Sequence, residues 1–102
     1  DMLQDYARTK GEEVATEFPR VEHVHVILDM EKRRQIAEVV VQARDHIRLE
    51  AAGESENMRV SIDAAVEKTT KQLRRLRDKV QDHKAAMKYV QAERSRGSET
   101  EQ

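Results

Sequence analysis

The chain has 102 residues, no cysteine and a formal net charge of −1. This length fits one small domain with a modest core, and the lack of cysteine excludes a disulfide framework, a thiolate zinc site and a cysteine nucleophile. No apolar run approaches the roughly 18 residues of a membrane span, so we expect a cytoplasmic domain that makes no use of a membrane.

The first predicted element is a helix from Asp1 to Phe18. Its apolar residues recur at spacings of three, four and seven, Asp1 is a suitable N-cap, and Pro19 cannot continue the helix. Gly11 in the middle costs about 1 kcal/mol relative to alanine, so the helix is intrinsically weak.

Three strands are predicted next. "VEHVHVILDM" (21–30) alternates, with Val24, Val26, Leu28 and Met30 on one face. A charged turn leads into "QIAEVVVQA" (35–43), and "HIRLEA" (46–51) closes an antiparallel meander. The polar stretch "AGESEN" (52–57), which contains Gly53, is expected to be a loop.

A long amphipathic helix is predicted after this loop. Its apolar stripe consists of Ile62, Val66, Thr69, Leu73, Leu76, Val80, His83 and Met87. The pattern ends near Ala92 in "ERSRGSETEQ", so we expect a domain over residues 1–90 and a polar, disordered tail or linker over 91–102. The fold class is α+β: helix, three-stranded antiparallel sheet, helix, with both helices on one sheet face.

Charge is segregated along the chain. Residues 1–67 hold nine Lys/Arg and fifteen Asp/Glu, whereas residues 68–102 hold ten and five. The candidate binding residues lie on the last helix: Lys68, Lys71, Arg74, Arg75, Arg77 and Lys79. Such a row can neutralise nucleic-acid phosphates and release their counterions. The alternative is a solvated face that only keeps the protein soluble.

Three stretches of the sequence resemble the bacterial ribosome hibernation-promoting factors, the ribosome-associated translation inhibitors. They are "DMLQDYARTK", "PRVEHVHVILDMEKRRQIAEVVVQA" and "ENMRVSIDAAVEKTTKQLRRLRDKVQDH". The resemblance covers about residues 1–84. It implies a domain that sits in the mRNA and tRNA channel of the small ribosomal subunit, contacts rRNA phosphates through the six cations, and blocks tRNA and mRNA occupancy in starved or stationary cells.

The sequence also departs from this family. The family's first strand, which precedes the first helix, is absent, so one sheet edge is left unpaired or pairs with another molecule. Gly11 stands where the family usually has leucine, and Arg59 where it usually has tyrosine.

Two other functions remain open on the sequence alone. The helix–three strands–helix order is also that of double-stranded RNA-binding domains, although their lysine cluster at the start of the last helix is missing here. A protein–protein module would self-associate through the free sheet edge or the distal part of the last helix.

No catalytic, metal or cofactor site is predicted. His23, His25 and His46 are candidate metal ligands on one sheet face, but exposed histidines of this kind are common and the spacing fixes no further ligand. The sequence has no glycine-rich phosphate loop and no serine-nucleophile motif, so we expect neither an enzyme nor a small-molecule substrate.

Overall fold

Five elements follow one another in the computed structural model, which describes the backbone of residues 1–93 and the side chains of residues 1–79. They are α1 (Met2–Glu17), β1 (Val21–Glu31), β2 (Arg34–Ala43), β3 (Ile47–Ser55) and α2 (Met58–Glu93). The predicted α+β class and element order are therefore confirmed.

Helix α1 begins and ends where the sequence predicts. The Asp1 carboxylate accepts hydrogen bonds from the backbone N–H groups of Leu3 (2.7 Å) and Gln4 (3.0 Å), which satisfies N–H groups that have no partner within the helix. Phe18 is the C-cap in an extended conformation. Leu3, one of the apolar residues at the predicted helical spacing, lies in the first turn and is 37% exposed.

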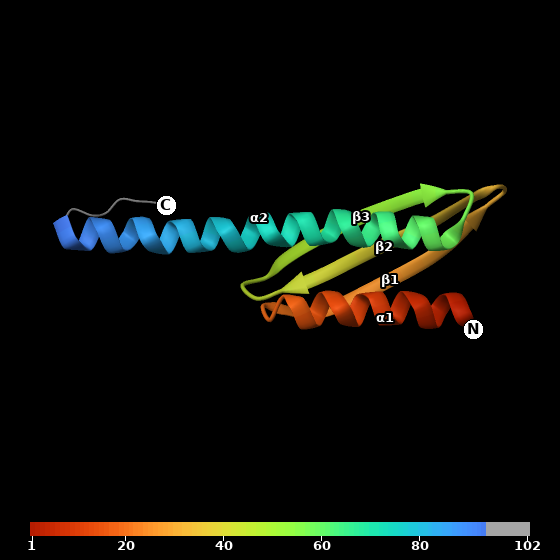
Figure 1. Cartoon of the computed structure of the whole chain (residues 1–102), viewed down its shortest axis with the longest axis horizontal. Coiled ribbons are helices and arrows are strands. Elements are labelled where there is room, and N and C mark those ends of the chain that lie inside the picture. The colour runs from red at the N-terminus through yellow and green to blue at the C-terminus, as the bar shows by residue number, and fades with distance from the viewer. Residues whose placement is uncertain (94–102) are drawn as a thin grey trace.

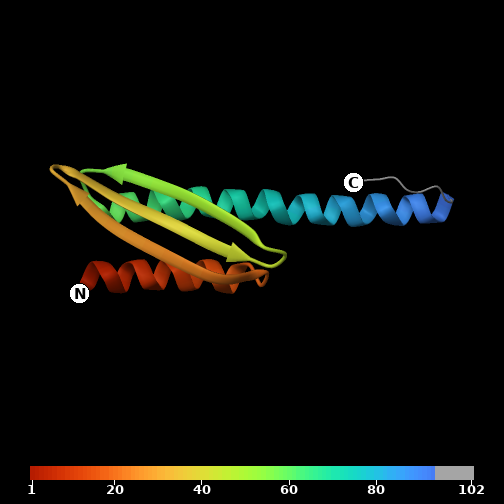
Figure 2. The ribbon, with the colours of Figure 1, turned by 180° about the vertical axis from the view of Figure 1, so that it is seen from behind.

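The three strands form one antiparallel sheet in the order β1-β2-β3. Both helices cover the same face, as predicted: they lie in front of the sheet in Figure 1 and behind it in Figure 2. Val39 of β2 pairs with Val26 of β1 and Ala51 of β3, and Val39 is fully buried under the helices together with Ala37 and Val41. The central strand therefore supplies the middle of the core.

One residue expected on the buried face of β1 is exposed. Met30 is 65% exposed, because the end of β1 runs past the helices toward the turn at Lys32 and Arg33 (Figure 1). The alternation of residues 24, 26 and 28 is correct, but the helices do not cover the strand to its end.

The third strand differs most from its prediction. It runs to Ser55, so Gly53 lies in the strand instead of in a loop, and His46 lies in the preceding turn with a positive φ of 62°. Gly53 is buried against α2, where a Cβ atom would lie only 2.2 Å from the Ser61 carbonyl oxygen. A glycine in this strand is thus explained by a close backbone approach.

Helix α2 is tied to the sheet at its N-terminal end. Asn57 Oδ1 accepts from the Val60 N–H (3.2 Å), as an N-cap does. The fully buried Ser61 hydroxyl donates to the Gln35 carbonyl oxygen of β2 (2.6 Å). Sequence periodicity did not predict Ser61 as part of the interior, since serine carries no apolar signal.

The C-terminal part of α2 extends beyond the sheet (Figures 1 and 2). Its 36 residues span about 54 Å, whereas a strand of about ten residues spans about 33 Å. Since α2 continues to Glu93, the predicted boundary at residue 90 lies in its last turn. The side chains of Val80, His83 and Met87 lie outside the described residues, and so do residues 94–102 of the predicted tail over 91–102.

Candidate nucleic-acid interface

The six cations predicted as binding residues are all exposed on α2. They occupy three different positions around the helix. Lys68 reaches the β3 edge, Arg74 and Arg77 reach the end of α1, and the remaining three point to the solvent side of the helix.

The cations on the shoulders contact the protein's own groups. Lys68 Nζ donates to the Ala52 carbonyl oxygen (2.8 Å), Arg74 Nη2 lies 3.5 Å from Glu17 Oε2, and the Arg77 guanidinium lies 5.3 Å from the centre of the Phe18 ring. These contacts fix where the three charges lie, and they engage part of each side chain's binding capacity.

The other three cations, Lys71, Arg75 and Lys79, form what we call the α2 ridge. They are spaced four residues apart, so each lies about 6 Å further along the helix axis. None of them forms an ion pair with a side chain within residues 1–79. The ridge therefore presents a line of charges that an external anion can reach.

A second group of cations lies where α1 meets the start of α2. The Tyr6 hydroxyl donates to Asp63 Oδ1 (2.5 Å), and its ring is flanked by Arg59 (4.2 Å to the ring centre) and Lys10 (5.5 Å). The hydrogen bond to Asp63 is the main reason that the pKa of Tyr6 is raised. Sequence analysis did not predict this group; the spacing of Tyr6 and Lys10, one helical turn apart, was the available signal.

The open face of the sheet carries the opposite charge. Arg34 pairs with Glu54 and Arg48 with Glu50, and the hydrogen bond from Arg34 is the main cause of the lowered pKa of Glu54. Three further carboxylates share this face and have no ion-pair partner among residues 1–79: Asp29, Glu31 and Glu38. Helix α2 thus presents a row of cations on one side of the molecule, and the sheet presents an acidic surface on the other.

The histidines do not converge with other ligands. His23 and His25 stack with their ring centres 6.2 Å apart, and His46 lies in the β2–β3 turn instead of in the strand. Among the described residues, His, Cys, Asp and Glu form no group of three or more that could hold a metal ion. The described helices also include none that is long and apolar enough to cross a membrane.

Comparison with known proteins places the chain in a family. Residues 1–81 match the family described as Sigma 54 modulation protein / S30EA ribosomal protein. The chain belongs to this family. The resemblance drawn from the sequence is thereby confirmed, and since the S30EA family is non-catalytic, so is the expectation that the protein is not an enzyme.

Two curated relatives carry the same name. The chain is 28% identical over 83 residues to the "Ribosome hibernation promoting factor" of Salmonella typhimurium, covering 81% of this chain and 86% of that protein. It is 27% identical over 81 residues to the protein of that name from Klebsiella oxytoca, covering 79% of this chain and 84% of the relative.

Solved structures show the same fold. The N-terminal domain of Protein Y from Thermus thermophilus superimposes with a TM-score of 0.66 at 22% identity, over 74% of this chain and 83% of that domain. A ribosomal subunit interface protein from Coxiella burnetii gives a TM-score of 0.60 at 20% identity, over 70% of this chain and 81% of the other. That the S30EA family's first strand is missing here stays a prediction.

Proposed function

We infer that the chain is a ribosome hibernation factor. It binds the small ribosomal subunit in the cytoplasm, with the α2 ridge against rRNA phosphates in the mRNA and tRNA channel. The bound protein occupies the space that mRNA and tRNA need, so translation is inhibited without any chemical step. Two curated relatives are named ribosome hibernation promoting factors, which supports the choice of partner.

The observation that carries this proposal is the exposed line of Lys71, Arg75 and Lys79. Each phosphate that they neutralise releases condensed counterions, so binding is driven by salt-dependent electrostatics. Structured rRNA is recognised mainly through its backbone and shape. Tyr6 and Phe18, the two aromatic side chains among the described residues, lie under cations of the protein itself, which disfavours a base-stacking platform.

The test is co-sedimentation with purified small ribosomal subunits at low and moderate salt. The wild type is compared with a triple charge-reversal variant of the α2 ridge, Lys71→Glu, Arg75→Glu and Lys79→Glu. A matched control makes the same change of net charge in the exposed turns, at Lys32, Arg33 and Arg44. Circular dichroism confirms that all three proteins are folded.

The proposal predicts that the wild type and the turn control pellet with the subunits and inhibit translation in a cell-free reaction, whereas the ridge variant does neither. Equal loss in both variants would mean that net charge, not the ridge, governs the association. A wild type that stays in the supernatant at physiological salt would remove the ribosome as the partner.

Binding to RNA duplexes in general is the second candidate, because the α–β–β–β–α order is shared with double-stranded RNA-binding domains. A long RNA duplex added as competitor separates the two functions. If the duplex and the small subunit bind with similar affinity, the general function is favoured; if the duplex competes only at a large excess, the ribosome is the specific partner.

A further inference from the structure

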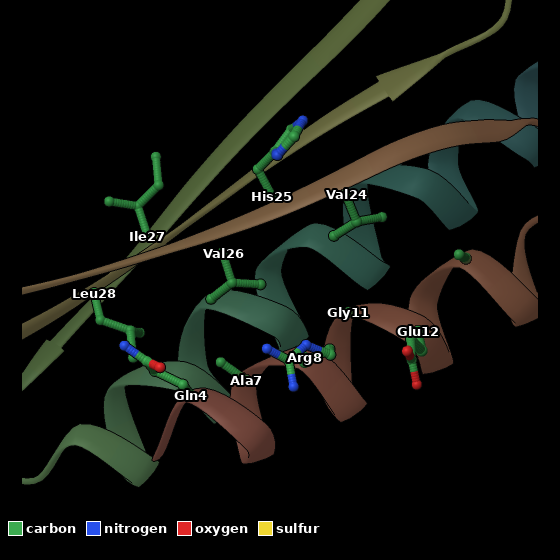
Figure 3. A pocket seen from close by; sticks show the side chains of 11 residues that line it. Gln4, Ala7, Arg8, Gly11, Glu12, Val24, His25, Val26, Ile27 and Leu28 are labelled. Carbon is green, nitrogen blue, oxygen red and sulfur yellow. The ribbon is translucent and has the colours of Figure 1, made fainter. Parts of the chain in front are cut away.

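The open face of the sheet carries apolar side chains as well as carboxylates. Val39 and its neighbours at positions 37 and 41 are buried under the helices, so the alternation along β2 places Ile36, Glu38 and Val40 on the opposite face. On β1, Ile27 points away from α1 (Figure 3) and is 50% exposed. The open face is therefore a mixed surface and not a uniformly polar one.

Glu38 lies at the centre of this face. It is directly opposite Ile27 of β1 and Ala52 of β3, and its neighbours on the same face of β2 are Ile36 and Val40. Since β2 is the central strand, these neighbours are set on both sides by strands that pair with it. Glu38 is half-buried and has no ion-pair partner within residues 1–79. An unpaired carboxylate is thus framed by apolar side chains.

The charges around this centre select the sign of a partner. The two arginines of the face, Arg34 and Arg48, are each paired with a carboxylate of β3. Asp29, which lies diagonally across from Glu38, has no ion-pair partner within residues 1–79. The uncompensated charge at the centre of the face is therefore negative, so the face repels nucleic-acid phosphates and attracts a cationic group.

An arginine side chain matches both parts of this arrangement. Its methylene groups can lie on apolar side chains, while its planar guanidinium donates two parallel hydrogen bonds to one carboxylate. A lysine ammonium is a more strongly hydrated point charge and lacks this fork. A metal ion is a poorer occupant, because His, Cys, Asp and Glu form no group of three or more that could hold one among the described residues.

We propose that the open face of the sheet binds a short arginine-bearing segment of a partner protein. The guanidinium pairs with Glu38, and aliphatic side chains beside the arginine pack on Ile27, Ile36 and Val40. This interaction goes beyond the proposed binding of rRNA and does not rest on it, because it uses the sheet face that the helices leave uncovered. The α2 ridge stays accessible, so the chain can hold RNA and a basic protein segment at the same time.

The probe is the blocked peptide Lys-Leu-Arg-Leu-Lys, and its matched control carries citrulline in place of arginine. Citrulline keeps the length and the planar end of the side chain but removes its charge. Binding to the ¹⁵N-labelled full chain is followed by amide chemical shifts. We expect shifts around Glu38 on β2 and at the paired positions of β1 and β3, with the α2 ridge unaffected. The citrulline peptide should bind about tenfold more weakly, because its hydrogen bonds to the carboxylate carry no charge of their own.

Variants of the protein complete a double-mutant cycle with the two peptides. Glu38→Gln should weaken binding of the arginine peptide about tenfold and leave the citrulline peptide nearly unchanged, which isolates the contact between the guanidinium and the carboxylate. Glu67→Gln, at an exposed position of α2, removes the same charge from the helical side and should change neither affinity. Ile27→Ala should weaken both peptides several-fold, since it removes apolar contact area. Amide spectra of the free variants verify that each is folded.

The proposal is overturned if millimolar peptide causes no shifts, if the arginine and citrulline peptides bind the wild type equally, or if Glu38→Gln and Glu67→Gln weaken binding to the same extent. Other occupants are tested in the same way. A short RNA duplex that shifts the amides around Glu38 as strongly as the peptide does would assign the face to nucleic acid. If the wild type self-associates in sedimentation velocity and Glu38→Gln makes it monomeric, the face belongs to a second copy and not to a partner's basic segment.

Discussion

Replacing Gly53 by alanine should destabilise the protein more than its single added methyl group suggests. Gly53 has no positive φ, so alanine is compatible with its backbone conformation. The difficulty is space: the new Cβ would lie 2.2 Å from the Ser61 carbonyl oxygen and 2.9 Å from the Ala65 nitrogen. Both atoms belong to the backbone of α2 and cannot rotate away.

The size of the effect follows from these distances. A relaxed carbon–oxygen contact is about 3.3–3.6 Å long, so α2 and β3 must separate locally by about 1 Å. Overpacking of this kind typically costs 1–3 kcal/mol. A backbone obstacle places Gly53→Ala at the upper end, about 3 kcal/mol, which corresponds to a Tm lower by roughly 12–24 °C.

Gly11 provides the matched control, since the same substitution should have the opposite effect there. Its added Cβ would meet Val24 Cγ1 at 3.4 Å and Val26 Cγ2 at 3.7 Å, which are ordinary contacts. Alanine is favoured over glycine within a helix by about 0.5–1 kcal/mol. We therefore expect Gly11→Ala to raise the Tm by a few degrees.

Urea denaturation and thermal melts of the two variants measure whether the substitutions change stability in opposite directions. The argument predicts free energies of unfolding that move in opposite directions from the wild type, with unchanged urea m-values. If Gly53→Ala changes stability by less than about 0.5 kcal/mol, the normal scatter of surface substitutions, the close approach of β3 and α2 does not exist as described.

Three further substitutions test individual charges. Lys71→Gln should reduce the slope of log K against log salt for subunit binding by about 0.7–1 without changing the Tm; an unchanged slope would mean that Lys71 meets no phosphate. Tyr6→Phe should cost at most about 1 kcal/mol, since the pair with Asp63 is exposed. Because the pKa of Tyr6 is raised, this cost is fully present below pH 10, the group's ordinary pKa, and disappears as the pH rises through the folded-state pKa. The difference in free energy of unfolding between the wild type and Tyr6→Phe should therefore be constant below pH 10 and decrease as the pH is raised further, and a difference that begins to decrease well below pH 10 would contradict the argument. Glu54→Gln should lower the Tm at neutral pH. Because Arg34 holds the pKa of Glu54 below 4.5, the difference from the wild type should shrink as the pH falls from about 4.5 through the folded-state pKa, and a difference that persists at pH 2 would argue against the pair.

The elements could be predicted from the sequence because their hydrophobic periods are unambiguous. A period of two over 21–30 and over 35–43 cannot form a helix with one apolar face, and Pro19 and the charged turn separate the segments. The end of β3 could not be predicted in this way, since Gly53 gives the same local signal in a loop and in a strand. Only the backbone of α2, which is distant in sequence, requires a glycine there.

The six candidate binding residues were predictable as exposed cations, but their separate contacts with the rest of the protein were not. Helical geometry alone places all six cations on the accessible surface of α2, which is where they lie. It does not show that Lys68 binds a carbonyl of β3 or that Arg77 lies over Phe18, because these partners come from other elements. The distinction matters for mutagenesis: reversing Lys68 or Arg77 would disturb both the fold and the binding surface, whereas reversing the α2 ridge changes only the charge offered to a partner.

The same reasoning explains why the acidic open face of the sheet could not be predicted from the order of charges along the chain. The chain is nearly neutral in total, with nineteen cationic and twenty anionic side chains, and its acidic half contains both α1 and the sheet. Packing both helices on one face leaves the carboxylates of β1 and β2, such as Asp29 and Glu38, together on the other. A cationic row on α2 and an acidic open face of the sheet are thus two consequences of one topology, since the helices cover one face of the sheet and leave the charged side chains of the other face exposed.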